Sequence, residues 1–192
     1  MEIKDILYNS IENHKEYIVS DIAQGKSSEI IETICKECLP VLDKFGGNKS
    51  EIFGGFAESL IHYLLTTALI PSQRKFTINN TYVDILIPDA KTLYSNPQDA
   101  LIITFPKTSD VLTIKNKIND LTKIQPNKEN LWFVLKSDFP EVKVYSFDEN
   151  GKNSFSNILN DLIGFLTKKK VQLEALLSKR NHNKHSQLAV EE

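Results

Sequence analysis

The sequence is short of several features, and each shortage excludes a class of protein. It has only two cysteines, Cys35 and Cys38, among 192 residues, which excludes a secreted scaffold held together by disulfides. No stretch approaches the roughly 20 apolar residues that a membrane-spanning helix needs. The N-terminus has no basic segment followed by an apolar one, as a signal peptide would. We therefore expect a cytoplasmic protein that makes no contact with the membrane.

An excess of charge of one sign is also lacking. The formal net charge is −2, from 23 basic and 25 acidic side chains, which argues against a protein that coats nucleic acid by bulk charge. The basic charge is concentrated near the C-terminus, where residues 168–185 carry a local charge of +5 and leave −7 for the rest. The candidate nucleic-acid-binding residues are those of this segment: Lys168, Lys169, Lys170, Lys179 and Arg180.

What the chain does contain is the composition of a folded protein, with 41% hydrophobic and 25% charged residues. The length suits one domain with appendages. Apolar residues recur every three to four positions in the first third of the chain and predict three helices, over 2–23, 27–42 and 50–70. Pro40 is expected to kink or stop the second helix. Cys35 and Cys38 lie on its apolar face and are interpreted as core residues.

The period then changes from that of a helix to that of a strand. Strands are predicted at 74–78, 81–88 and 100–105, and Asn79-Asn80 is a hairpin signal between the first two. A helix over 111–125, strands at 131–135 and 142–147, and a last helix from about residue 154 complete the pattern. This order favours an α/β sandwich. We expect N-terminal helices (1–48), an α/β core (49–153), a C-terminal amphipathic helix (154–180) and a disordered tail (181–192).

Three charged residues lie at informative places in the predicted core. Glu58 lies at the edge of the third helix's apolar stripe, Asp84 interrupts the apolar strand Tyr82–Ile87, and Lys107 follows the strand that ends at Phe105. An acid embedded in so hydrophobic a strand must be paired, hydrogen-bonded or bound to a metal if it stays ionised. Asp84 is therefore the most informative single residue.

With these residues the chain resembles the PD-(D/E)XK nuclease superfamily, the restriction-endonuclease-like fold. The segment Gly54–Leu60 looks like its helical Glu motif, Val83-Asp84-Ile85 like its metal-binding Asp motif, and Ala100–Ile103 like the strand that leads to its ExK motif. The resemblance covers about residues 50–147. It implies a mixed sheet flanked by helices and action on DNA or RNA.

The resemblance also implies a chemistry and its residues. Glu58 and Asp84 would hold Mg²⁺, the metal would polarise a phosphodiester, and Asp84 with Lys107 would form the catalytic pair. The acid of the ExK motif is missing, however, because Phe105 stands two residues before Lys107. If Thr104 takes the place of the acid, then Pro106 takes that of the lysine. The nuclease site is therefore incomplete.

The two acids also have a purely structural interpretation. Glu58 would be a solvated residue paired with His62, one helical turn away. Asp84 would form a buried salt bridge with Arg74, Lys75 or Lys107 in the sheet. Both interpretations remain open at this point.

The C-terminal helix adds a further alternative. Leu159, Leu166 and Leu173 are spaced by seven residues, as in a short coiled coil, so residues 158–180 are a candidate homo-oligomer contact. Two hypotheses follow. The first is a nucleic-acid-binding protein with a nuclease-like fold, with Mg²⁺-dependent hydrolysis if its degenerate site still works. The second is a non-catalytic oligomeric module for single-stranded nucleic acid or protein, with Phe105, Tyr82 and Tyr94 as base-stacking residues.

Overall fold

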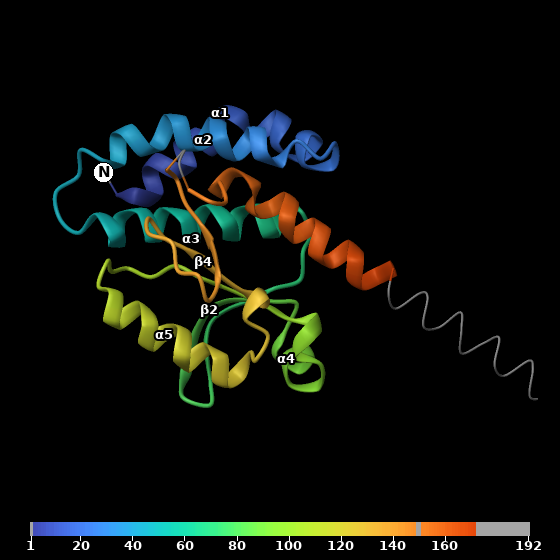
Figure 1. Cartoon of the computed structure of the whole chain (residues 1–192). Coiled ribbons are helices and arrows are strands. Elements are labelled where there is room, and N and C mark those ends of the chain that lie inside the picture. The colour runs from blue at the N-terminus through green and yellow to red at the C-terminus, as the bar shows by residue number, and fades with distance from the viewer. Residues whose placement is uncertain (1, 149–150, 172–192) are drawn as a thin grey trace, which may run out of the picture. The chain divides into compact units, whose positions relative to one another are not determined.

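The computed structural model describes residues 2–148 and 151–171 (Figure 1). The chain divides into two compact units, residues 1–159 and 160–192. The first unit holds a five-stranded sheet with helices on both faces. In the second unit the described residues, 160–171, are helical. No helix in the described ranges combines the length and the apolar character needed to cross a membrane.

The sheet has its strands in chain order, β1 to β5. Strands β1 and β2 pair antiparallel, as do β2 and β3, whereas β3, β4 and β5 run parallel. The mixed sheet confirms the predicted α/β class. The strands are β1 Gln73–Ile78, β2 Thr81–Ile87, β3 Leu101–Thr104, β4 Leu131–Val134 and β5 Lys143–Tyr145.

Long helices cover both faces of the sheet. On one side lies α3 (Lys49–Thr67), and α1 (Ile3–Ala23) and α2 (Ser27–Leu42) lie beyond it; on the other side lies α5 (Val111–Ile124) (Figure 1). Every residue of β3 and β4 is buried, because a central strand covered on both faces has no solvent side. The unbroken apolar runs in the sequence have this cause.

The hairpin between β1 and β2 is the one that Asn79-Asn80 predicts. Both residues adopt positive φ, 47° and 62°, as a two-residue type I′ turn requires, and asparagine tolerates this region better than most residues. Ile78 and Thr81 pair directly beside the turn. The turn therefore sets the register that places Asp84 in the sheet.

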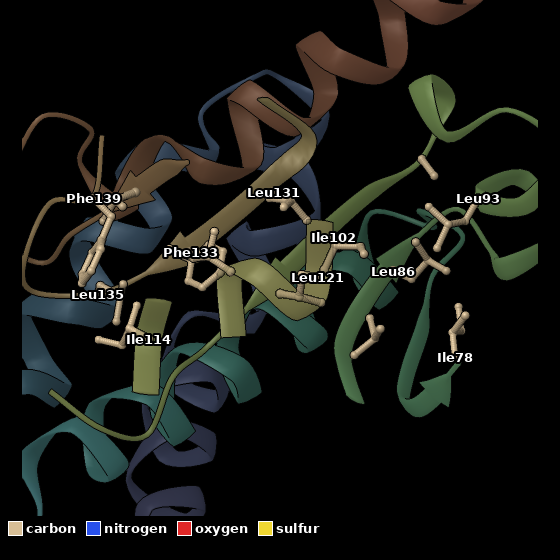
Figure 2. Close-up of a cluster of buried hydrophobic side chains, with 14 residues drawn as sticks. Ile78, Leu86, Leu93, Ile102, Ile114, Leu121, Leu131, Phe133, Leu135 and Phe139 are labelled. Carbon is tan, nitrogen blue, oxygen red and sulfur yellow. The ribbon is translucent and has the colours of Figure 1, made fainter. Parts of the chain in front are cut away.

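A buried cluster between α5 and the sheet forms the core of this side (Figure 2). It includes Ile102 and Phe133 from the strands and Ile118 and Leu121 from α5. It also includes Leu93 from α4 (Ala90–Ser95), a helix that the sequence analysis did not predict. Helix α4 is too short to show periodicity in the sequence. Its N-cap is Asp89, whose side chain accepts a hydrogen bond from the Thr92 N–H.

Pro40 does not end α2, which continues to Leu42. A proline this close to the end of a helix removes one hydrogen bond of the last turn, and that loss is tolerated. Both cysteines are free; Cys38 is buried and Cys35 half-buried. Burial raises the pKa of the Cys35 thiol to about 12, as expected of an inert core cysteine.

Within the described residues, three short 3₁₀ turns connect the larger elements. They are η1 Pro97–Asp99, η2 Lys128–Asn130 and η3 Phe155–Asn157. Gln125 and Asn130 hold η1 in place, because both side-chain amides donate hydrogen bonds to the carbonyls of Pro97 and Ala100. Buried polar groups are thus satisfied at the start of β3, and this fixes the strand that leads to the candidate site.

Candidate functional site

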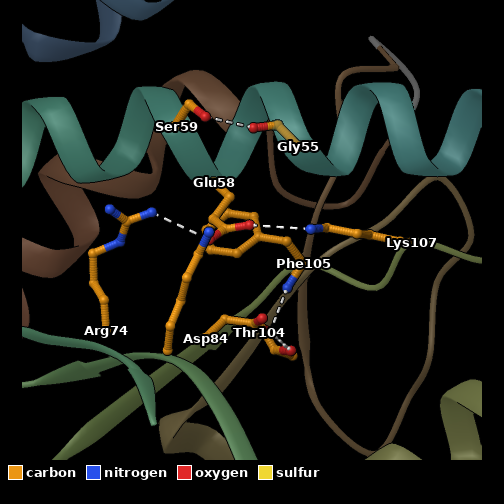
Figure 3. Close-up of polar contacts among 9 residues, drawn as sticks. Gly55, Glu58, Ser59, Arg74, Asp84, Thr104, Phe105 and Lys107 are labelled. Carbon is orange, nitrogen blue, oxygen red and sulfur yellow. Dashed lines mark hydrogen bonds and ion pairs between the residues drawn. The ribbon is translucent and has the colours of Figure 1, made fainter. Parts of the chain in front are cut away.

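Glu58 projects from α3 toward the sheet and carries three cationic partners (Figure 3). Its Oε1 lies 3.2 Å from Arg74 Nη2 and 3.1 Å from Lys75 Nζ, and its Oε2 lies 3.5 Å from Lys107 Nζ. The Glu58 side chain is only 4% exposed, so it is not the solvated residue of the structural interpretation. His62 makes no ion pair with it within the described chain. We call Glu58, Arg74, Lys75 and Lys107 the Glu58 cluster.

The backbone of β1 is shaped so that two neighbouring side chains reach the same carboxylate. Consecutive strand residues normally point to opposite faces of a sheet. Lys75 has a φ of 51°, which breaks this alternation and lets both Arg74 and Lys75 contact Glu58. The sequence analysis named these two residues as partners of Asp84, and the structure gives them to Glu58 instead. In the sequence, the only sign that these residues share one acidic partner is that Arg74 and Lys75 are adjacent.

Gly54 brings Lys107 to the cluster. A Cβ on Gly54 would lie 3.3 Å from the Pro106 carbonyl oxygen and 3.5 Å from that of Phe105, so glycine allows the chain after β3 to approach α3 closely. Gly54 and Glu58 are four residues apart and share a face of α3. The close approach therefore carries Lys107 to the Glu58 carboxylate. Lys107 lies beyond the end of β3 rather than within it.

The charges of the Glu58 cluster favour an ionised Glu58. Burial alone would raise the pKa of this carboxyl, but the hydrogen bond from Lys75 and the charges of Lys107, Lys75 and Arg74 outweigh it and lower the pKa. Burial and the positive charge of Arg74 lower the pKa of His62, one turn along α3. At neutral pH the site thus holds one anion, three cations and a neutral imidazole.

Asp84 forms a separate centre at the end of β3. Its Oδ2 accepts a hydrogen bond from the Thr104 hydroxyl and another, of 3.2 Å, from the backbone N–H of Phe105 (Figure 3). Ile85 pairs with Ile103, so one step further along the register Thr104 lies opposite Asp84. Thr104 is therefore the β3 residue directly across from Asp84. Its hydroxyl donates to Asp84, whereas a carboxylate there would repel it.

A lysine of α5 also belongs to the surroundings of Asp84. Lys117 of α5 donates to the carbonyl of Tyr82 and lies 5.2 Å from the centre of that ring. Burial lowers the pKa of Lys117, and the negative charges of Asp84 and Asp120 partly offset the effect. Asp84 and Glu58 therefore have different cationic neighbours, and no hydrogen bond or ion pair joins the two centres among the described residues.

The expected Mg²⁺ site can be tested on these contacts. Mg²⁺ needs carboxylate oxygens that are free to coordinate it. Both Glu58 oxygens are occupied by cations, and Oδ2 of Asp84 by two hydrogen-bond donors. In the described ranges no three His, Cys, Asp or Glu side chains gather closely enough to hold a metal ion. The residues in this arrangement do not fit the metal, and Mg²⁺ at Glu58 and Asp84 stays a prediction.

The predicted nucleic-acid-binding residues fall partly outside what the structure describes. Lys168 and Lys170 are exposed, and the Lys169 ammonium lies 5.6 Å from the centre of the Phe165 ring. Lys179 and Arg180 lie outside the described residues, as does Leu173 of the heptad series. Among the proposed stacking residues, Tyr82 and Tyr94 are exposed. Phe105 is 2% exposed and cannot stack on a base, so that expectation is wrong.

A cavity of about 500 Å³ borders the segment that carries Lys107. Aromatic side chains of Phe53, Phe139 and Phe147 contribute to its lining, together with Gly54 and Pro106. None of the residues of the Glu58 cluster lines it. The chain after β3 therefore borders the cavity through Pro106 and contacts Glu58 through Lys107.

Comparisons with known proteins support the fold. No family model and no curated protein sequence matches the chain. Among solved structures, the chain is similar to a restriction endonuclease, PspGI, in a complex with its substrate DNA. The match has 16% identity and a TM-score of 0.59, and it covers 88% of this chain and 94% of that one. The chain therefore has a restriction-endonuclease-like fold.

Proposed function

We propose that this protein binds nucleic acid through a nuclease-like fold and does not hydrolyse phosphodiesters at Asp84. The observation that carries the proposal is the bond from the Thr104 hydroxyl to Asp84. A two-carboxylate metal site needs a second acid at this position, and a neutral hydroxyl is a poor ligand for Mg²⁺. Asp84 here ties β2 to the end of β3 and has a structural role.

The occupied state of Glu58 supports the same conclusion. To bind a metal ion, Glu58 would have to give up its ion pairs with Arg74, Lys75 and Lys107, at a cost in electrostatic free energy. The fold itself favours a nucleic-acid partner, since the similar structure is a complex with DNA. Fold similarity does not by itself carry an activity, so the proposal rests on the site.

The experiment measures binding and cleavage together. Labelled single-stranded, duplex and branched DNA and RNA are incubated with the full chain in Mg²⁺ or Mn²⁺, and compared with Asp84→Asn and the control Asp138→Asn. Asp138 is an exposed acid in the loop after β4. We expect all three proteins to bind and none to cleave, with an affinity that falls as salt rises.

The second candidate function, Mg²⁺-dependent hydrolysis, has a different outcome. Oδ1 of Asp84 has no hydrogen-bond partner within the described residues, and this oxygen is the one observation that favours a ligand role. Cleavage by the wild type and by Asp138→Asn but not by Asp84→Asn would establish that activity and overturn our proposal. Absence of binding to every nucleic acid would overturn both.

A further inference from the structure

The Glu58 cluster carries more positive charge than its own carboxylate neutralises. Three cations surround one anion, which leaves an excess of two positive charges. The Lys75 and Lys107 side chains are 55% and 49% exposed, whereas Glu58 is 4% exposed. The carboxylate therefore forms a buried anchor, and the lysine ammonium groups that it holds remain accessible to an incoming anion.

The cluster is maintained at a conformational cost. Lys75 adopts left-handed backbone geometry within a strand, and for a residue with a side chain this conformation is strained. Strained residues of this kind concentrate at ligand sites, because only the surrounding structure can hold them there. A lysine that pointed away in regular strand geometry would avoid the strain. The strain is explained if the ammonium group is needed beside Glu58.

Two buried nitrogen atoms in the same region lack a partner. Among the described residues, Arg74 Nε and His62 Nδ1 are the buried side-chain atoms without a hydrogen bond. An arginine Nε is always a donor, and a buried donor without an acceptor costs free energy. An anion bound at Arg74 would supply an acceptor. This observation is independent of the charge excess and points to the same kind of ligand.

From these observations we infer that the Glu58 cluster is a metal-independent binding site for a phosphate dianion, supplied by the terminal phosphate of a nucleic-acid strand. The inference rests on the proposed function, since it names the part of the nucleic acid that this site binds. A phosphomonoester carries close to two negative charges at neutral pH, which matches the excess charge of the cluster. An internal phosphodiester carries one and would leave the match incomplete.

The chemistry of the cations suits this ligand. An arginine and two lysines offer charge-assisted donors from three directions, and such hydrogen bonds are about twice as strong as neutral ones. Glu58 acts as a positioning residue, because it holds the three side chains but does not touch the phosphate. In this arrangement the cations take the charge-neutralising role that a metal ion would otherwise have.

The test compares strand ends. Binding of the full chain is measured by fluorescence anisotropy with a short oligonucleotide that ends in a 5′-phosphate, a 3′-phosphate or hydroxyls only. We expect one phosphorylated end to bind about tenfold more tightly than the hydroxyl end, which corresponds to about 1.4 kcal/mol. Lys75→Gln and Lys107→Gln should each remove this preference, so that phosphorylated and hydroxyl ends bind equally. Lys123→Gln, which removes an exposed α5 lysine paired with Asp120, should keep it.

A second measurement uses inorganic phosphate as the probe. Phosphate stabilises many proteins through the solvent, so the readout is the difference in melting temperature shift between the wild type and the Lys75→Gln/Lys107→Gln double variant. A larger shift in the wild type supports the anion site. Equal shifts in the two proteins would overturn it.

Together the two measurements separate the possible failures. Equal binding of phosphate and hydroxyl ends overturns the terminal-phosphate inference and leaves the nucleic-acid function intact. No oligonucleotide binding, with a phosphate shift specific to the wild type, would assign the site to a free phosphate compound and overturn the proposed function. Absence of both effects would overturn the two proposals together.

Discussion

The two candidate acids have the same chemistry and opposite environments. Glu58 is surrounded by cations that need it, so its negative charge organises a positively charged site. Asp84 accepts hydrogen bonds from a hydroxyl and a backbone N–H, and these bonds link β2 to the end of β3. Neither role could be assigned from residue type. Each depends on which side chains the fold delivers.

The first prediction concerns the pH dependence of the Glu58 cluster. The pKa of Glu58 is lower in the folded protein than its ordinary value. Its ionisation therefore stabilises the fold above the unfolded pKa, about 4.3, and this contribution is lost as the pH falls through the folded pKa. Glu58→Gln should lower the free energy of unfolding at pH 7 by about 1.5–3 kcal/mol, the size of a hydrogen bond to a charged group.

Urea unfolding from pH 7 down to pH 3 checks this prediction. The gap between wild type and Glu58→Gln should narrow as the pH falls below the unfolded pKa, because a protonated Glu58 resembles glutamine. Glu16→Gln, at an exposed position on α1, provides the control and should show no gap at any pH. A Glu58→Gln gap that stays constant with pH would contradict the ionised cluster.

At the scale of elements, the register between β2 and β3 decides what the site can be. The pairing of Ile85 with Ile103 sets Thr104 opposite Asp84, and β3 ends at Thr104. Phe105, Pro106 and then Lys107 follow, so the lysine lies beyond the sheet and reaches Glu58 of α3. The spacing in the sequence shows that the ExK acid is absent. Only the register shows that Thr104 lies opposite Asp84 and donates a hydrogen bond to it.

This register predicts a gain of metal binding. Thr104→Asp places a second carboxylate beside Asp84, and the two like charges should destabilise the protein without metal. Mg²⁺ should restore stability by bridging them, and raise the melting temperature by about 2–4 °C, the shift that about 1 kcal/mol produces in a domain of this size. Thermal unfolding with and without Mg²⁺ measures the effect.

The matched control is Thr104→Asn, which has a similar shape and no charge. Neither this variant nor the wild type should respond to Mg²⁺ beyond a common solvent effect. If Mg²⁺ leaves the melting temperature of Thr104→Asp unchanged, Thr104 does not occupy the position of the missing acid.

At the scale of the whole molecule, the sequence predicted the architecture more reliably than the site. The long helices and the five strands have strong periodicity or unbroken apolar runs, and these signals come from the residues themselves. Helix α4 was not predicted, because it has a single buried side chain, Leu93, and one apolar position gives no periodicity. The partners of Glu58 could not be predicted, because they depend on the positive φ of Lys75 and on the close approach at Gly54, which are properties of the assembled fold.

The charge distribution of the chain leads to the last prediction, which concerns the C-terminal lysines. If Lys168, Lys169 and Lys170 contact phosphates, replacing all three with glutamine should reduce the salt slope of binding to a single strand by about 2, because each neutralised phosphate contributes about 0.7. The control replaces Lys15, Lys36 and Lys123, which lie on α1, α2 and α5 in exposed ion pairs, and so changes the net charge equally. Anisotropy titrations over a range of salt concentrations measure both slopes. Equal slopes in the two triple variants would mean that Lys168, Lys169 and Lys170 act only through net charge, and the contacts to nucleic acid would then have to come from other residues of the chain.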